Sequence, residues 1–277
     1  MPNQQIPGEP TDEIVRALAD VYGLDISRYE AGFLRRTITK RMGETGAGTI
    51  PAYAGQLAGD REEAQKLCSS LRIAHTEFFR NPLSFAVIEQ VILPVLVEAK
   101  KKSGGEIRVW SAGCSYGQEA WSIAMLLDEL AGPVAYRIFA TDLEEPVSAR
   151  HGVYSPGDVG NVRARHLSEY FHRQGDSFSI IARLRERVDF SACDLLDGRT
   201  AIPAASIYGD FDLILCCNLL FYYHPEARRR ILDKIRSGLA PGGYFVTGDV
   251  ERDMVAAHSG LYAMAPSAAV FQTTPRK

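Results

Sequence analysis

Two acidic residues, each placed directly after a predicted apolar strand, are the first candidates for binding chemistry in this sequence. Asp142 ends the strand predicted at 136–141, and Asp194 follows the strand predicted at 188–193. Carboxylates at the carboxyl ends of parallel strands lie at the edge of a sheet where ligands bind. An acid in the first position accepts hydrogen bonds from ribose hydroxyls, and one in the second could reach an adenine amino group. The pair therefore predicts a nucleoside site.

A glycine-bearing turn precedes Asp142 and narrows the kind of nucleoside. The strand predicted at 107–111 runs into Gly113-Cys114-Ser115-Tyr116-Gly117, and a helix begins at Gln118. The turn lacks the G-x-G-x-x-G pattern, whose glycines serve a pyrophosphate, and it contains no basic residue. A cofactor without phosphates, such as S-adenosylmethionine, fits such a turn.

The residues after the strand predicted at 211–216 belong to the same sheet edge. Asn218 and Leu219 follow this strand closely, and Tyr222 comes three residues later. Taken singly, Asn218 is better explained as a turn former and Tyr222 as a core aromatic with a satisfied hydroxyl. Their occurrence together with Asp142 and Asp194, all at strand ends, favours a binding site.

The order of the predicted elements defines the fold class. Strands at 107–111, 136–141, 188–193, 211–216 and 243–247 alternate with helices at 118–130, 146–151 and 226–239. Such alternation predicts an α/β fold, a parallel sheet with helices on both faces. A long apolar helix at 83–100, which Pro94 is expected to kink, comes before this sheet. The tail, 261–273, could close the sheet edge with antiparallel strands.

Two further regions differ from this alternation. The first eighty residues predict short helices, one carrying Ile14, Leu18 and Val21 on a buried face, so we expect a helical N-terminal domain at 1–80 and a second domain at 81–277. Residues 152–187 are too long for an ordinary strand connection and predict an inserted β-rich subdomain, with a hairpin strand at 178–184.

Composition excludes several classes of protein. A formal net charge of −3 over 277 residues argues against a general nucleic-acid binder. The five cysteines show no metal-ligand spacing, so we expect reduced thiols and no metal site. No apolar run approaches the roughly 20 residues that span a bilayer, and the N-terminus lacks a signal pattern. We therefore expect a cytoplasmic protein with no membrane insertion.

Several segments, in order and spacing, carry a resemblance to a known family. These are Thr76-Glu77-Phe78-Phe79-Arg80, Trp110-Ser111-Ala112-Gly113-Cys114-Ser115 followed by Gly117 and Glu119, Ala140-Thr141-Asp142, Gly152-Val153-Tyr154, Cys216 with Asn218 and Tyr222, and Pro241-Gly242-Gly243-Tyr244. Over nearly the whole chain they resemble the CheR-type chemotaxis receptor O-methyltransferases. The resemblance implies a class I S-adenosylmethionine-dependent methyltransferase (Rossmann-like) sheet, a small all-helical N-terminal domain and an inserted β-subdomain.

The resemblance also implies an activity and a set of site residues. The activity is methyl transfer from S-adenosylmethionine to glutamate side chains on chemoreceptor cytoplasmic helices, which gives glutamyl methyl esters and S-adenosylhomocysteine in chemotaxis adaptation. The catalytic candidates are Arg80, for steering the substrate carboxylate, and Tyr222, for bordering the methyl-donor pocket. Cofactor binding is assigned to Thr76, Arg80, Glu119, Asp142, Asp194, Leu195, Asn218 and Leu219.

Chemoreceptor cytoplasmic domains are the partners that the resemblance implies. A basic group, Arg35, Arg36, Lys40 and Arg41, could face an acidic receptor helix, although a charge run is usually only a solvated helix face. Family members that bind a C-terminal receptor pentapeptide carry a glycine-rich loop, whereas the loop at 173–177 is short and has one glycine. We therefore expect no tight pentapeptide binding, and we expect a monomer.

The chain departs from the family pattern at four positions near the site. Ala74, Gln118, Cys217 and Asp194 stand where the family has asparagine, glutamate, arginine and asparagine. Two alternatives stay open: a divergent methyltransferase that acts on another acceptor, and a non-catalytic S-adenosylmethionine-binding module that regulates a partner. A nicotinamide dehydrogenase is disfavoured by the glycine spacing.

Overall fold

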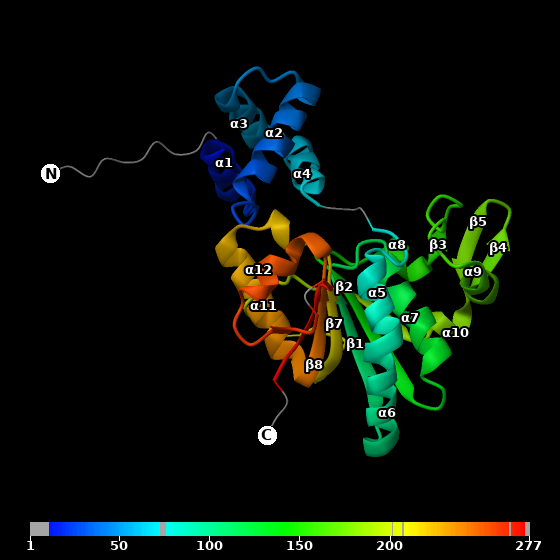
Figure 1. Ribbon diagram of the computed structural model, residues 1–277. Helices are drawn as coiled ribbons and strands as arrows, with labels where there is room; N and C mark the ends of the chain where they lie inside the picture. The colour runs from blue at the N-terminus through cyan, green and yellow to red at the C-terminus, as the bar shows by residue number, and fades with distance from the viewer. Residues whose placement is uncertain (1–10, 73–75, 201, 207, 266, 275–277) are drawn as a thin grey trace. The chain divides into compact units, whose positions relative to one another are not determined.

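The computed structural model describes residues 11–72, 76–200, 202–206, 208–265 and 267–274 (Figure 1). The chain divides into two compact units, and each is described by itself. The helical unit comprises the residues up to 73 together with Phe221–Arg228, and the sheet unit comprises the remainder.

Four short helices build the helical unit: α1 Asp12–Tyr22, α2 Ala31–Thr45, α3 Ile50–Gly59 and α4 Arg61–Ser70. Their ends follow local sequence signals, because Thr49 and Asp60 accept hydrogen bonds from the first-turn N–H groups of α3 and α4. Ile14 and Leu18 are fully buried, as predicted, whereas Val21 is 48% exposed and was wrongly placed on that face.

Arg41 belongs to the interior of the helical unit. Its guanidinium pairs with Glu63, and the Tyr53 hydroxyl donates to the same carboxylate at 2.6 Å. The Arg41 side chain is only 15% exposed, so its grouping with cations that face a receptor was wrong. The other three cations of that group, on α2, are exposed.

The sheet unit is built on seven strands in the order β6-β2-β1-β7-β8-β10-β9. The first five are parallel to their neighbours, and β10 and β9 close the edge in antiparallel pairing, as the sequence predicts. The strands are β1 Glu106–Ala112, β2 Ala135–Asp142, β6 Val188–Ala192, β7 Phe211–Cys216, β8 Leu239–Thr247, β9 Tyr262–Ala263 and β10 Val270–Gln272. Strand order reverses between β1 and β7, which makes their carboxyl ends the topological switch point.

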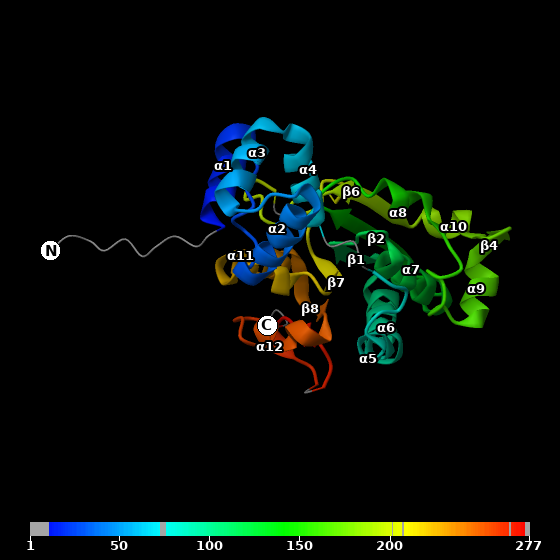
Figure 2. The ribbon, with the colours of Figure 1, turned by 90° about the horizontal axis from the view of Figure 1, so that it is seen from above.

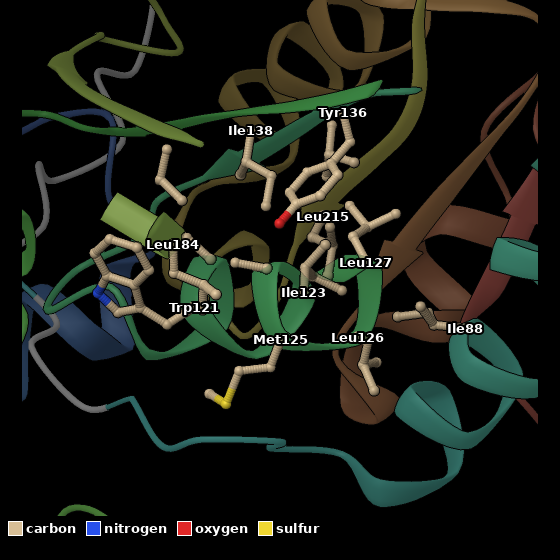
Figure 3. Close-up of a cluster of buried hydrophobic side chains, with 14 of the residues drawn as sticks. Ile88, Trp121, Ile123, Met125, Leu126, Leu127, Tyr136, Ile138, Leu184 and Leu215 are labelled. Atoms are coloured by element: carbon tan, nitrogen blue, oxygen red, sulfur yellow. The ribbon is translucent and has the colours of Figure 1, made fainter. Parts of the chain in front are cut away.

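Helices cover both faces of this sheet (Figure 2). On one face Ile123, from α7, packs with Ile138 and Leu215 of the strands (Figure 3). On the other face the end of α11 approaches Trp110, since a Cβ on Gly238 would lie 3.5 Å from that ring. The main helices are α5 Pro82–Val87, α6 Leu93–Ser103, α7 Gln118–Leu130, α8 Val147–His151, α11 Pro225–Gly238 and α12 Arg252–Ala256.

A π-helical turn, Ile88–Ile92, joins α5 to α6 within one helix. Pro94 lacks the N–H for the next α-helical bond and would crowd the preceding turn, so a wider turn accommodates it. Among the described residues, Pro82–Ser103 is the one helix long and apolar enough to cross a membrane, with 22 residues and a hydropathy of 1.6. The long apolar helix predicted at 83–100 is confirmed, whereas the expectation that no apolar run approaches the length of a membrane span was wrong. Ile88 and Leu96 are buried in the core of the sheet unit, as in an ordinary core helix.

The inserted region forms a three-stranded sheet in the order β3-β5-β4. Its elements are β3 Val153–Tyr154, α9 Ala164–Tyr170, β4 Phe171–Gln174, β5 Ser177–Ile180 and α10 Ala182–Arg185. The strand predicted to continue to 184 was wrong beyond Ile180. Residues of good helix propensity follow there, and Leu184 turns inward to be fully buried in the core (Figure 3).

Candidate methyltransferase site

The end of β2 and the turn after β1 form one hydrogen-bonded corner. Asp142 Oδ2 accepts a bond of 2.7 Å from Ser115 N, and Oδ1 accepts one of 2.8 Å from Leu143 N. The Gly113 N–H donates to Thr141 O at 2.8 Å. Each carboxylate oxygen keeps a lone pair for a ligand hydroxyl, so Asp142 is fixed at the carboxyl edge and still able to bind.

Two glycines allow the turn to pack closely. Gly113 and Gly117 have φ of 78° and 88°, which favours glycine. A Cβ on Gly113 would lie 3.0 Å from the Leu219 side chain, and one on Gly117 would lie 2.9 Å from the Ala149 Cβ. The predicted cofactor residue Leu219 therefore lies against the glycine turn.

Glu119 lies in the first turn of α7, beside the end of β1. Its carboxylate accepts a bond of 2.7 Å from the Ser111 hydroxyl at the end of β1. Burial raises the pKa of Glu119 above its ordinary value of 4.5. Hydrogen bonds from Ser111 and the Cys217 thiol oppose this shift, as does the charge of Arg80. Glu119 thus joins α7 to the end of β1.

The loop after β7 is held by a buried carboxylate, Glu251. Its Oε2 accepts bonds from Asn218 N at 2.8 Å, Gly248 N at 2.9 Å and the Thr247 hydroxyl at 2.7 Å. Its Oε1 accepts a bond of 2.6 Å from Leu220 N. Burial raises the pKa of Glu251, and these hydrogen bonds oppose that shift. One fully buried side chain therefore fixes the backbone that presents Asn218.

Asn218 also contacts the segment before α5. The Asn218 backbone is left-handed, with a φ of 59°. A Cβ on Gly248 would lie 2.7 Å from the side-chain nitrogen of Asn218. Asn81 donates to the Asn218 side-chain oxygen at 3.4 Å, and its own φ is 60°. Non-glycine residues in this conformation are strained and concentrate at functional sites. Asn81 directly follows Arg80, so this contact joins Arg80 to the loop after β7.

Aromatic residues anchor the segment 76–80. Phe78 is fully buried, and its ring lies edge-on to Tyr154 at 4.9 Å and Phe171 at 5.6 Å. The Phe79 N–H donates to the Ser122 hydroxyl at 3.0 Å. The segment is thus fastened to the inserted subdomain on one side and to α7 on the other. Thr76 begins it and is partly exposed.

Asp194 and Leu195 lie beside the end of β2. The Cys193 N–H donates to Asp142 O at 2.7 Å, which brings the chain after β6 to this corner. The Asp194 carboxylate accepts from Leu196 N at 2.8 Å, and Leu195 is 8% exposed. Their roles in cofactor binding remain predictions.

Tyr222 makes its recorded contacts in the helical unit. Its ring lies 4.8 Å from Phe33, and its carbonyl accepts a bond of 2.8 Å from Glu30 N. Tyr222 belongs to the helical unit, and its assignment to the methyl-donor pocket stays a prediction.

The residues that depart from the family pattern lie in different environments. Gln118 is 3% exposed, and among the described residues its buried side-chain oxygen has no hydrogen-bond partner. Cys217 stands where the family has arginine, and its thiol donates to Val246 O at 3.8 Å. Ala74 lies outside the described residues.

Sequence reasoning missed three residues that shape the site: Ser111, Asn81 and Glu251. Glu251 follows the fifth predicted strand, so the strand-end argument applied to Asp142 could have found it. Asn81 was interpreted only as a domain boundary. Ser111 lies inside a strand, and no sequence signal marks its contact with Glu119.

These groups fit S-adenosylmethionine. Asp142 can accept from two ribose hydroxyls, and Gly113 leaves room for close backbone approach. Because burial raises the pKa of Glu119, a cationic ligand group such as an ammonium or sulfonium would stabilise its ionised form.

The sheet order, the glycine turn after β1 and the acid that ends β2 define a class I S-adenosylmethionine-dependent methyltransferase. Comparison with known families agrees. Residues 74–268 match the CheR methyltransferase, SAM binding domain, and residues 11–71 match the CheR methyltransferase, all-alpha domain. The chain belongs to the CheR methyltransferase family, and S-adenosylmethionine is its cofactor.

Curated relatives carry matching names. A chemotaxis protein methyltransferase of Listeria monocytogenes is 30% identical over 86% of this chain and 88% of its own length. The chemotaxis protein methyltransferase of Escherichia coli is 28% identical over 83% of this chain and 79% of its own length. A 104.1 kDa protein of Rhodobacter capsulatus is 31% identical over 88% of this chain, which spans only 26% of that relative. Among solved structures, the match with N-methyltransferase NodS from Bradyrhizobium japonicum covers 65% of this chain and 85% of that chain, at 17% identity and a TM-score of 0.32.

Proposed function

We propose that this protein transfers the methyl group of S-adenosylmethionine to glutamate side chains on the cytoplasmic helices of chemoreceptors, giving glutamyl methyl esters. The observation that carries the proposal is the position of Arg80, whose neighbour Asn81 donates to the Asn218 side chain at 3.4 Å beside the cofactor corner. This position brings a guanidinium, suited to a substrate carboxylate, to the groups that fit the cofactor.

The chemistry is an in-line displacement that needs no general base. A glutamate on an exposed helix has a pKa of about 4.3 and is ionised at neutral pH. Bound cofactor supplies an activated methyl group. A substrate oxygen would take this methyl group, and the electron pair of the broken carbon–sulfur bond would stay on the sulfur of S-adenosylhomocysteine. Arg80 orients the carboxylate, and orientation alone can contribute on the order of 7–11 kcal/mol.

The direct test combines a binding titration with a transfer assay. Calorimetry should show binding of S-adenosylmethionine and S-adenosylhomocysteine, and labelled methyl groups should pass to receptor cytoplasmic fragments and be released by mild base, as expected of esters. Arg80→Ala should lower transfer more than cofactor binding. Normal cofactor affinity without transfer to any receptor fragment would instead support the regulatory alternative. Transfer to another protein in a lysate would support a divergent acceptor.

Exposed cations of α2 are proposed to dock an acidic receptor helix. Arg36 and Lys40 are four residues apart, and therefore share one face of α2. Arg36→Glu with Lys40→Glu should lower receptor methylation and leave cofactor affinity intact. An equal loss of both would contradict the docking role.

We further propose that the protein does not bind a receptor pentapeptide tightly and acts as a cytoplasmic monomer. The β4–β5 connection is only Gly175 and Asp176, which leaves little loop for a peptide to pair with. Micromolar affinity for such a peptide in calorimetry would refute the first statement.

A further inference from the structure

A cavity of ≈ 340 Å³ lies beside Arg80 within the sheet unit. One wall is the turn that carries Phe79, Arg80 and Asn81, continued by the first turns of α5, and the facing wall carries Asn161 and Arg163. This volume is at the lower end for ligand pockets and suits one or two side chains of a polypeptide better than a large cofactor. Because Asn81 lines the cavity and donates to the Asn218 side chain at 3.4 Å, the cavity adjoins the proposed methyl-transfer site.

Arg163 is held in a fixed orientation at this cavity. Its Nη1 and Nη2 donate to the two carboxylate oxygens of Glu89 at 2.7 and 2.6 Å, and its guanidinium lies over the Phe79 ring at 6.0 Å. The hydrogen bond from Arg163 lowers the pKa of Glu89, so this carboxylate stays ionised. Two of the five guanidinium N–H groups serve Glu89, and three remain as donors to a ligand. Because Glu89 already holds the Arg163 guanidinium in one orientation, Arg163 loses little side-chain entropy when a ligand binds.

The charge of the lining groups favours an anion. Arg80 and Arg163 are cationic, and Glu77 is the one carboxylate in the described lining. Glu77 accepts a bond of 2.9 Å from the Asn161 amide, which leaves the Asn161 oxygen and its second N–H for a ligand. The side chains that line the cavity therefore carry a formal positive charge, and Glu89, which pairs with Arg163, offsets part of it.

We propose that this cavity is the acceptor-side pocket, that it takes an acidic side chain of the polypeptide substrate, and that Arg163 is its anchor. The proposal rests on the proposed function for the identity of the substrate, and the pocket itself can be tested separately. Among the described residues, the Arg163 side chain contacts Glu89 and Phe79. These contacts lie outside the corner that Asp142 forms, so Arg163 should set the affinity for the substrate and leave the affinity for the cofactor unchanged.

The chain offers a matched control for Arg163. Arg165 is similarly exposed, at 59% against 48%, and also pairs with Glu89, at 3.6 Å, but it does not line the cavity. Both substitutions, Arg163→Gln and Arg165→Gln, remove one exposed charge near the same carboxylate. A general effect of charge would appear in both variants, and an effect of the pocket would appear in one.

The test measures receptor-fragment methylation by the full chain. Arg163→Gln should raise KM for the fragment about tenfold or more, as expected for a lost hydrogen bond between charged groups, with kcat and the cofactor Kd unchanged. Arg163→Lys should recover part of the affinity, and Arg165→Gln should behave as wild type. Equal effects of the two glutamine variants, or an unchanged KM for Arg163→Gln, would overturn the proposal.

A second titration separates this proposal from the proposed function. If the wild-type protein transfers no methyl group to any receptor fragment, the proposed function is refuted, but the pocket proposal is not. The S-adenosylhomocysteine-bound protein is then titrated with a glutamate-containing helical peptide and with its glutamine counterpart. Tighter binding of the acidic peptide, lost in Arg163→Gln but kept in Arg165→Gln, would support the pocket. Absent binding, or binding equal in the two variants, would overturn it.

Discussion

Two glutamates whose carboxylates are shielded from solvent, Glu63 in the helical unit and Glu119 in the sheet unit, differ in how their negative charge is compensated. Glu63 of the helical unit is matched by the Arg41 guanidinium and the Tyr53 hydroxyl, and although burial opposes it, hydrogen bonds hold the pKa of Glu63 below 4.5. Glu119 of the sheet unit receives neutral hydrogen bonds, and burial raises its pKa. A buried carboxylate whose charge is matched by its neighbours stabilises a fold, whereas one whose charge is only partly matched, in the first turn of α7, favours a cationic ligand.

The largest effect is expected at Asp142. Asp142→Ala should weaken S-adenosylmethionine and S-adenosylhomocysteine by about a thousandfold, because two hydrogen bonds to a charged acceptor are lost. Calorimetry measures this change. Asp60→Ala is the control in the other unit: it removes the cap of α4, costs about 1 kcal/mol of stability and leaves cofactor affinity unchanged.

Exchanging each glutamate for glutamine should separate stability from binding. Glu63→Gln removes the buried partner of Arg41 and leaves this cation paired only with the more exposed Glu44, so the free energy of unfolding should fall by about 3 kcal/mol at an unchanged cofactor Kd. Glu119→Gln should weaken the cofactor about tenfold, without a comparable loss of stability. Urea unfolding followed by circular dichroism, with calorimetry, measures both. The comparison would fail if Glu63→Gln weakened the cofactor as much as Glu119→Gln does.

A Glu251→Gln variant tests whether this carboxylate affects cofactor binding only through the backbone that it holds. Glu251→Gln replaces one acceptor oxygen with an NH₂ group, which faces N–H donors of the loop after β7. Cofactor affinity should fall several-fold, up to about tenfold. Thr247→Val removes only the hydroxyl donor and should have a smaller effect. A Glu251→Gln protein with wild-type affinity would show that the loop does not depend on this contact.

The pH dependence of stability should have opposite signs in the two units. The raised pKa of Glu119 makes its contribution to stability present below 4.5 and lost as pH rises through the folded value. The lowered pKa of Glu63 makes its contribution present above 4.5 and lost as pH falls through the folded value. Relative to wild type, Glu119→Gln should therefore gain stability with rising pH, and Glu63→Gln should lose it.

Tryptophan fluorescence can follow the first of these changes, because Trp110 and Trp121 are the two tryptophans and both lie in the sheet unit. Circular dichroism follows the second. Parallel pH profiles for the two variants would contradict the assignment.

Local sequence signals predicted most of the elements. The helix at 118–130 agrees with α7 at both ends, because Gly117 precedes it and its apolar residues recur at helical spacing. The strand predicted at 178–184 was wrong beyond Ile180, because a buried Leu184 is compatible with either a strand or a helical turn. Periodicity cannot separate these in so short a run, and packing on α7 decided.

The sequence by itself determined the parallel sheet, the glycine turn and the acid at the end of β2, since these depend on chain order, backbone conformation and strand ends. It also carried the family resemblance, which the comparisons establish. Only the tertiary structure separated Arg41, matched within its unit, from the exposed cations of α2. It also brought Glu251 to the loop after β7 and Arg163 to the cavity beside Arg80. Charge compensation depends on which distant groups come together, and residue type and spacing do not encode that.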